Sequence, residues 1–190
     1  KNTGSLFQAN GAKIYMDGVV EGSTAYLREP YGHLPNFRGE PRWHRDKLNV
    51  MCAELDRNEF QIHVHAIGDA ATAMTLDALA YAEKQNGKRD ARNLVTHLQL
   101  VDAKDVPRFR ELGVVAVPQP YWFMKDDLYY KIQVPYLGLK RADEEYPMAS
   151  FFKAGVVVAS SSDYAVTIPC DPLRAIQIGI TRSVPGVTDP

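Results

Sequence analysis

The stretch Gln61-Ile-His-Val-His-Ala-Ile-Gly-Asp69 is an apolar, β-branched run whose strand-like part ends in a side chain able to bind a metal, His65. Two later stretches share this design: Leu94-Val-Thr-His-Leu-Gln-Leu100 carries His97, and Val156-Val-Val-Ala-Ser-Ser-Ser-Asp163 ends in Asp163. In a parallel α/β barrel, catalytic groups stand where the strands run into the loops of the C-terminal face. Three strands that each deliver a His or Asp there, with Lys13 on a fourth, favour metal-assisted hydrolysis.

Alternation of apolar residues and β-branching predict five strands, which span Ala12–Asp17, Phe60–Ala66, Asn93–Gln99, Val114–Pro118 and Val156–Ser160. Helical patterns lie between and after them, at His44–Arg57, from Asp69 as N-cap to about Gln85, from a capping box of Asp102 and Asp105 to Gly113, from about Glu144 to Lys153, and from Asp171 to about Arg182. Because strands and helices alternate, we expect an α/β fold with a parallel sheet. The aromatic segment 121–136 is expected to be a long loop. It is either a lid or pocket wall for an apolar substrate group, or a loop packed over the barrel rim.

The spacing of the candidate residues fits the repeat of a barrel. His65 and His97 are 32 residues apart, about one βα unit of a barrel of roughly 250 residues, and Asp163 follows 66 residues later, at about two units. Lys13 precedes His65 by 52 residues, one unit with an insertion, and the inserted stretch Gly22–Pro41 fits a substrate-side loop. We therefore expect a contiguous five-stranded arc of a (β/α)₈ barrel with these four side chains at one rim.

Composition limits the class of protein. The chain has 190 residues, 45% hydrophobic and 24% charged, which is ordinary for one globular domain. A net charge of −1 argues against nucleic-acid binding, which needs a basic stripe. No apolar run is long enough for a membrane helix and Lys1–Asn10 lacks the core of a signal peptide, so we expect a cytoplasmic protein without membrane contact. The two cysteines are too few for a disulfide scaffold.

The two clearest ligand candidates are histidines at strand ends. His97 shares a predicted strand face with Val95 and Gln99, and imidazole nitrogens suit a divalent metal of the zinc type. His63 shares the face of His65 two residues deeper. A His-x-His pair belongs on the first strand of barrel metallohydrolases, whereas another strand precedes this one. We therefore interpret His63 as interior packing or as a support for the ligands.

Two further candidates have alternative interpretations. A neutral Lys13 inside a barrel can take up carbon dioxide on its amine and present a carboxylate that bridges two metals. The alternatives are a strand-end Lys that reaches solvent, or one that forms an ion pair with Asp17. Asp163 either binds the metal and acts as base toward the water that it activates, or caps a helix in a Ser-rich turn.

A family resemblance adds to these patterns. It rests, in order along the chain, on Ala12-Lys-Ile-Tyr-Met-Asp-Gly-Val-Val-Glu21, Thr24-Ala25, His63-Val-His-Ala-Ile-Gly-Asp69, Thr96-His-Leu-Gln-Leu-Val-Asp102, Val117-Pro-Gln-Pro120 and Ser162-Asp163. These motifs resemble the amidohydrolase superfamily, and more closely its family 3, which includes N-substituted formamide deformylases and other metal-dependent hydrolases.

The resemblance implies a metal-dependent (β/α)₈ barrel flanked by a small β-sandwich, and a hydrolase acting on a C–N bond of an amide, formamide or cyclic amide. It makes Lys13 the fourth-strand ligand, often carboxylated in relatives, His65 the fifth-strand ligand and His97 the sixth-strand ligand. Asp163 becomes the eighth-strand carboxylate that binds metal and transfers a proton. The implied cofactor is one or two divalent metal ions, with zinc as the expected metal, and the implied substrate is a small molecule.

The sequence also departs from the family pattern. Gly22-Ser23 replaces a frequent Ser-Arg, and Tyr164-Ala165 replaces a frequent Trp-Pro. The first-strand His pair, strands two and three and the sandwich have no counterpart, so we expect residues 1–190 to be the C-terminal part of a longer barrel domain. Alone, this piece is expected to be inactive, to bind metal weakly or not at all, and to self-associate. The alternative is a non-catalytic α/β module with structural histidines.

Overall fold

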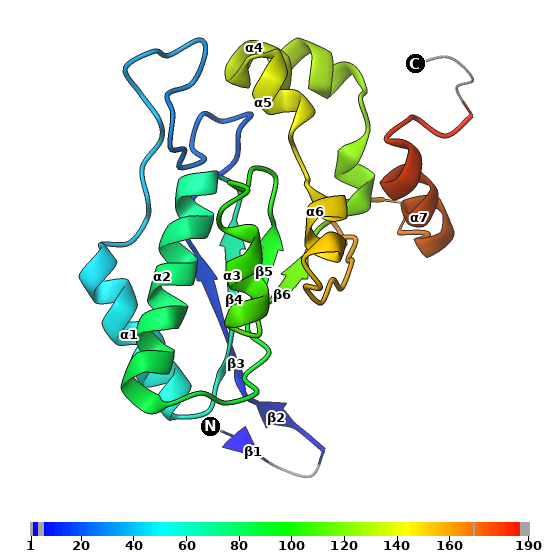
Figure 1. Ribbon diagram of the computed structural model, residues 1–190. Helices are drawn as coiled ribbons and strands as arrows, with labels where there is room; N and C mark the ends of the chain where they lie inside the picture. The colour runs from blue at the N-terminus through cyan, green and yellow to red at the C-terminus, as the bar shows by residue number, and fades with distance from the viewer. Residues whose placement is uncertain (1, 4–5, 169, 187–190) are drawn as a thin grey trace.

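A computed structural model describes residues 2–3, 6–168 and 170–186. Its centre is a parallel sheet in which the strands follow one another in chain order (Figure 1). The strands are β3 (Gly11–Tyr15), β4 (Gln61–Ala66), β5 (Leu94–His97) and β6 (Val115–Val117). Four of the five predicted strands are thereby confirmed, with ends shifted by at most two residues. A short antiparallel pair, β1 (Asn2–Thr3) and β2 (Gln8–Ala9), precedes the sheet.

Helices connect and follow the strands, as the alternating pattern predicted. They are α1 (Arg45–Arg57), α2 (Asp69–Asn86), α3 (Val106–Glu111), α4 (Val134–Leu137), α5 (Leu139–Asp143), α6 (Met148–Lys153) and α7 (Pro172–Thr181), with a 3₁₀ turn at Pro120–Phe123 and a π turn at Tyr129–Gln133. Within the described ranges, no helix combines the length and the apolarity that crossing a membrane would require.

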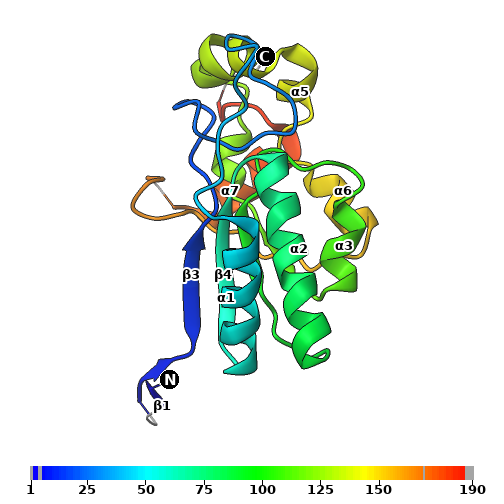
Figure 2. The ribbon, with the colours of Figure 1, turned by 90° about the vertical axis from the view of Figure 1, so that its left-hand side faces the viewer.

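The sheet has one covered face and one open face. Figure 2 shows α1, α2 and α3 on one side of β3 and β4, and no described helix on the opposite side of these two strands. Tyr15 on the open side is 56% exposed, whereas Ile14, the next residue along β3, is buried. A parallel sheet covered on one face only is an arc of a barrel, and the open face is the one that a closed barrel would turn inward.

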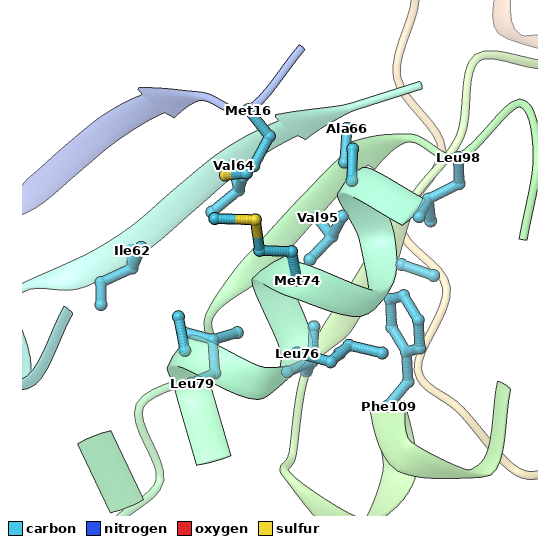
Figure 3. Packing of buried hydrophobic residues seen from close by; sticks show 14 of the residues in the cluster. Met16, Ile62, Val64, Ala66, Met74, Leu76, Leu79, Val95, Leu98 and Phe109 are labelled. Carbon is cyan, nitrogen blue, oxygen red and sulfur yellow. The ribbon is translucent and has the colours of Figure 1, made fainter. Parts of the chain in front are cut away.

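The main core lies between the sheet and α2 (Figure 3). Ile62, Val64 and Ala66 of β4 pack toward the helices and are almost fully buried. Because side chains alternate along a strand, His63 and His65 then project from the opposite, open face. The alternation of β4 thus stabilises the fold with one set of residues and presents two histidines with the other.

The fifth predicted strand, Val156–Ser160, forms only an isolated parallel bridge between Val158 and Ala116. Ala116 donates to the Val157 carbonyl at 2.9 Å and its own carbonyl accepts from Ala159 at 2.9 Å. The segment therefore lies where the next strand was expected, beside β6. The ladder does not lengthen because Pro118 has no N–H to donate.

Several helix boundaries differ from the prediction. The last short helix before this segment begins at Met148 rather than at Glu144, because Tyr146 adopts a left-handed φ of 52°. The N-cap of α2 is Gly68, one residue before the predicted Asp69.

Two further expectations are also corrected. The predicted capping box is wrong: the carboxylate of Asp105, at the N-cap of α3, accepts hydrogen bonds from Arg28 and Arg108 instead of a helix N–H. Residues 121–136 are not a plain loop, since they include the 3₁₀ turn, the π turn and most of α4.

Candidate metal centre

His65 stands at the end of β4 and is buried. Its Nε2–H donates to the Gly18 carbonyl at 2.9 Å, and the same nitrogen lies 3.6 Å from Oδ1 of Asp17. Burial lowers the pKa of His65, and the nearby charge of Lys13 acts in the same direction. The ring is therefore neutral near pH 7, with the lone pair of Nδ1 free of the carbonyl contact.

His97 is brought to the same place by a break in β5. The sequence pattern put His97 and Val95 on one strand face, but His97 has a φ of 79° and Leu98 a φ of 55°, so the alternation stops there. Val95 and Leu98 enter the core on the helix side, while the His97 ring lies 4.4 Å from the His65 ring, centroid to centroid. Left-handed backbone at a His is unusual and concentrates at functional sites.

Two residues that sequence reasoning did not single out hold the His97 ring. Its Nδ1–H donates to Oε1 of Gln119 at 2.9 Å, and the Gln119 amide donates to Oγ of Ser161 at 2.7 Å. Trp122 stacks on the other side, with ring centroids 5.0 Å apart and planes within 2°. Burial, with His65 as a smaller contributor, lowers the pKa of His97 to about 3, so its Nε2 carries a free lone pair. Two signals could have drawn attention to Gln119: it follows the predicted strand Val114–Pro118, and it belongs to the resemblance motif Val117-Pro-Gln-Pro120.

Lys13 lies on the open face one strand over, but in the row of His63 rather than of His65. The strand register pairs Lys13 with His63 and Tyr15 with His65. Lys13 Nζ donates to Nε2 of His63 at 3.3 Å. Partial burial lowers the pKa of Lys13, and the Asp163 carboxylate opposes this shift. Burial, with Lys13 second, lowers the pKa of His63 to about 4, so His63 accepts this bond as a neutral ring.

Asp163 follows the bridge segment and has a left-handed φ of 57°. The negative charge of its carboxylate acts to raise the pKa values of Lys13, His63 and His65, although burial is the larger effect and lowers each of them. The Asp163 carboxylate therefore lies within electrostatic reach of these three side chains. No helix begins at Asp163, since the next helix is capped by Asp171, whose side chain accepts from the Leu173 N–H. The helix-capping alternative for Asp163 is therefore not what the structure contains.

Asp17 supports the loops around the site instead of pairing with Lys13. Its buried carboxylate accepts three backbone N–H groups, from Ile67 at 3.0 Å, Gly68 at 2.8 Å and Tyr26 at 2.9 Å. Burial raises the pKa of Asp17 to about 7, and the three backbone bonds act against that shift. Asp17 thereby ties the end of β3 to the end of β4, next to His65.

The predicted substrate-side loop packs against the α4–α5 segment. The Gly32 N–H donates to the Tyr136 carbonyl at 2.6 Å, and Arg141 donates to the Pro30 carbonyl at 2.7 Å. Tyr31 is buried beside Leu137. The insertion after β3 and the segment after β6 therefore form one packed structure beyond the strand ends.

The donor chemistry fits a divalent metal in part. Two neutral, adjacent imidazoles, each fixed by a hydrogen bond through its other nitrogen, are the usual form of histidine ligands. Within residues 2–3, 6–168 and 170–186, however, His, Cys, Asp and Glu side chains nowhere gather in threes closely enough to hold an ion. The structure thus brings His65 and His97 together, pairs Lys13 with His63, and leaves Asp163 at electrostatic range.

An arc of a parallel barrel with histidines at its strand ends is the architecture of barrel metallohydrolases. Comparison with protein families agrees: the amidohydrolase family model matches residues 1–188, and the chain belongs to this family. The fold is accordingly part of a (β/α)₈ barrel, as the sequence predicted.

Individual relatives support this assignment. Protein LONG AFTER FAR-RED 3 of Arabidopsis thaliana is 32% identical over 177 residues, which are 92% of this chain and 30% of the relative. The crystal structure of an uncharacterized metal-dependent hydrolase from Pyrococcus furiosus matches with a TM-score of 0.78 and 28% identity over 94% of this chain and 35% of that chain. A second such hydrolase, from Pyrococcus horikoshii, matches with a TM-score of 0.76 and 25% identity over 93% and 35%. The chain spans about a third of the length of these proteins.

Proposed function

We propose that this chain contributes the metal-binding rim of a hydrolase that cleaves a C–N bond of a small amide, formamide or cyclic amide. The observation that carries the proposal is the pair of neutral, buried imidazoles at the ends of adjacent strands, 4.4 Å apart. Membership of the amidohydrolase family supports it. Residues 1–190 are on this proposal the C-terminal part of the barrel domain.

His65 and His97 would hold the metal, with Lys13 and Asp163 completing the set on this chain. A bound zinc ion would supply a Lewis acid that activates water for attack on the amide carbon. Gln119 keeps the His97 proton on Nδ1, so that Nε2 faces the site. The Asp163 carboxylate accepts the proton of the attacking water and returns it to the leaving nitrogen. Trp122 shields the ring of His97 from solvent.

The test is the His97→Ala variant of the purified full-length parent protein, with zinc content measured by elemental analysis and turnover measured on a panel of N-substituted formamides and cyclic amides. We expect loss of zinc and a fall in rate of several orders of magnitude. His44→Ala is the matched control, since His44 is exposed at the N-cap of α1 and is not one of the four candidate ligands. Unchanged turnover in a His97→Ala enzyme of verified metal content would contradict the mechanism.

A second candidate is a non-catalytic α/β module in which the histidines are structural. It is favoured by the hydrogen bonds that His65 and His97 already make to Gly18 and Gln119. It is also favoured because, among the described residues, no three His, Cys, Asp or Glu side chains lie close enough together to hold a metal ion. Metal content decides between the two: a protein purified without chelators that holds no zinc, and takes up none on dialysis, would favour the module.

We further propose that a polypeptide limited to residues 1–190 is inactive and self-associates through the open face of the sheet. The side chains of Lys13 and Tyr15 on that face are exposed. An uncovered face and an unpaired edge of a sheet favour association with another copy. Sedimentation of this polypeptide is the test. A stable monomer with stoichiometric zinc and amidase activity would overturn this proposal.

A further inference from the structure

A cavity of about 700 Å³ lies on the helix side of the molecule, between α1, α2, α3 and the loop after β3. None of the four candidate metal-site residues lines it. Its lining is strongly charged: five side chains are cationic and two are carboxylates, namely Arg28, Arg38, Arg45, Lys104 and Arg108 against Asp77 and Asp105. The cationic side chains in the lining of this cavity thus outnumber its carboxylates by five to two.

The two carboxylates in the lining are already fully engaged. Asp105 is almost completely buried and accepts from Nη2 of Arg28 at 2.7 Å and from Nη1 of Arg108 at 2.9 Å. Asp77 accepts from Nη2 of Arg108 at 2.7 Å and also from Arg45. Each carboxylate is thus shared between two guanidinium groups and leaves part of their positive charge uncompensated.

The remaining two cations increase this excess. Lys104 pairs with Asp102 at 3.0 Å, but Arg28 shares the same carboxylate at 3.3 Å. Arg38 takes part in none of the ion pairs found among the described residues; it donates to the Arg28 carbonyl at 3.4 Å and lies 5.5 Å from the Tyr26 ring. The charge of a fourth aspartate, Asp69, also acts on Arg28. Five cations therefore face four aspartates, which leaves an excess of one positive charge, and Arg38 is the cation in the lining without an ion pair among the described residues.

We propose that this cavity binds the phosphate group of a small phosphorylated molecule. Guanidinium groups match the geometry of phosphate oxygens, and a concave site lined by one sign of charge concentrates the opposite ion. Arg38 and Lys104 are the cations best placed to contact the ligand, because Arg38 forms no ion pair among the described residues and Lys104 shares its aspartate, Asp102, with Arg28. The volume suits a small organic phosphate, and a concave site of this kind does not suit a flat membrane surface.

The experiment is a titration of the purified protein with inorganic phosphate at constant ionic strength, followed by phosphorus NMR. We expect saturable binding in the millimolar range. Arg38→Gln and Lys104→Gln should each weaken it about fivefold to tenfold, the effect of one charge about 4 Å away at an effective dielectric constant close to that of water. Arg57→Gln is the matched control: it removes the same charge from the exposed end of α1, outside the cavity, and should leave binding within about twofold.

Two further controls make the result decisive. Circular dichroism of each variant verifies that the fold is kept, and Arg38 and Lys104 are exposed enough to be replaced without loss of core. His97→Ala must keep phosphate binding, since phosphate held by a metal centre would be lost with that ring. Absence of saturable binding, equal weakening by Arg57→Gln, or loss of binding in His97→Ala would each overturn the proposal.

Discussion

Replacing Gly68 by Ala should destabilise the protein by more than its small size suggests. Gly68 ends the loop between β4 and α2, with an ordinary φ of −82° that alanine adopts without strain. The obstacle is space: a Cβ at this position would lie 2.0 Å from the Tyr26 carbonyl oxygen, whereas ordinary contact begins near 3.4 Å. The two backbone segments would have to separate by more than 1 Å.

That separation costs both packing and hydrogen bonds. The Tyr26 carbonyl accepts from the Ala71 N–H at 3.2 Å, and the Tyr26 N–H donates to Asp17 at 2.9 Å. Overpacking costs about 1 to 3 kcal/mol and each lost buried bond about 1 kcal/mol, which gives about 3 to 5 kcal/mol in total. Because Asp17 lies beside His65, the same shift should disturb the candidate metal centre.

Urea unfolding followed by circular dichroism measures the change. Gly11→Ala is the matched control, since its added Cβ would meet nothing closer than the Gln61 carbonyl at 3.9 Å. We expect that control to be unchanged or more stable by up to about 1 kcal/mol, because alanine reduces the entropy of the unfolded chain. A free energy of unfolding for Gly68→Ala within about 0.5 kcal/mol of the parent would refute the steric argument.

Three further predictions concern the core, the pH dependence and the ligand support. Phe109→Ala empties a fully buried site and should cost about 3 to 5 kcal/mol, whereas Phe152→Ala, at 60% exposure, should cost under about 0.5 kcal/mol in the same urea assay. Burial raises the pKa of Glu145 to about 8, whereas the unfolded chain releases this proton above about pH 4.5. The folded protein therefore holds a proton that the unfolded chain has lost, and its free energy of unfolding falls as the pH rises from 5 to 8. Over that range the stability of Glu145→Gln relative to the parent should increase by up to about 4 kcal/mol, because Gln has no proton to lose. Parallel curves of unfolding free energy against pH for the two proteins would contradict this. Gln119→Ala leaves the His97 ring free to turn and should weaken zinc binding about tenfold to a hundredfold in a competition titration; an unchanged affinity would remove Gln119 from the ligand support.

The strands could be predicted because their signal is local. Ile62, Val64 and Ala66 alternate with His63 and His65, and only one register of such a strand buries the apolar set. The same reasoning located β3, β5 and β6, and the spacing between them indicated a barrel. It failed at Val156–Ser160, which forms only one bridge to β6, because Pro118 directly after β6 has no N–H to donate to a longer ladder.

The candidate site was predictable in its residue types and not in its arrangement. Strand alternation placed His97 with Val95, but the left-handed backbone at His97 and Leu98 turns the imidazole toward His65. No periodicity encodes that reversal, which is held by Gln119 and Trp122 from the segment after β6. Asp17, expected near Lys13, instead accepts three backbone N–H groups, one from its own loop after β3 and two from the loop after β4.

The amino-acid sequence by itself determined the order of strands and helices, which faces are apolar, and which side chains able to bind metal stand at strand ends, because all of these follow from spacing along the chain. Only the tertiary structure decided which of those side chains meet, how Lys13 came to pair with His63, and where the cations of α1, α3 and the loop after β3 converge. These contacts join residues that are far apart in the chain, 50 positions for Lys13 and His63 and 77 positions for Arg28 and Asp105. Their geometry depends on how the elements pack, which local spacing does not specify.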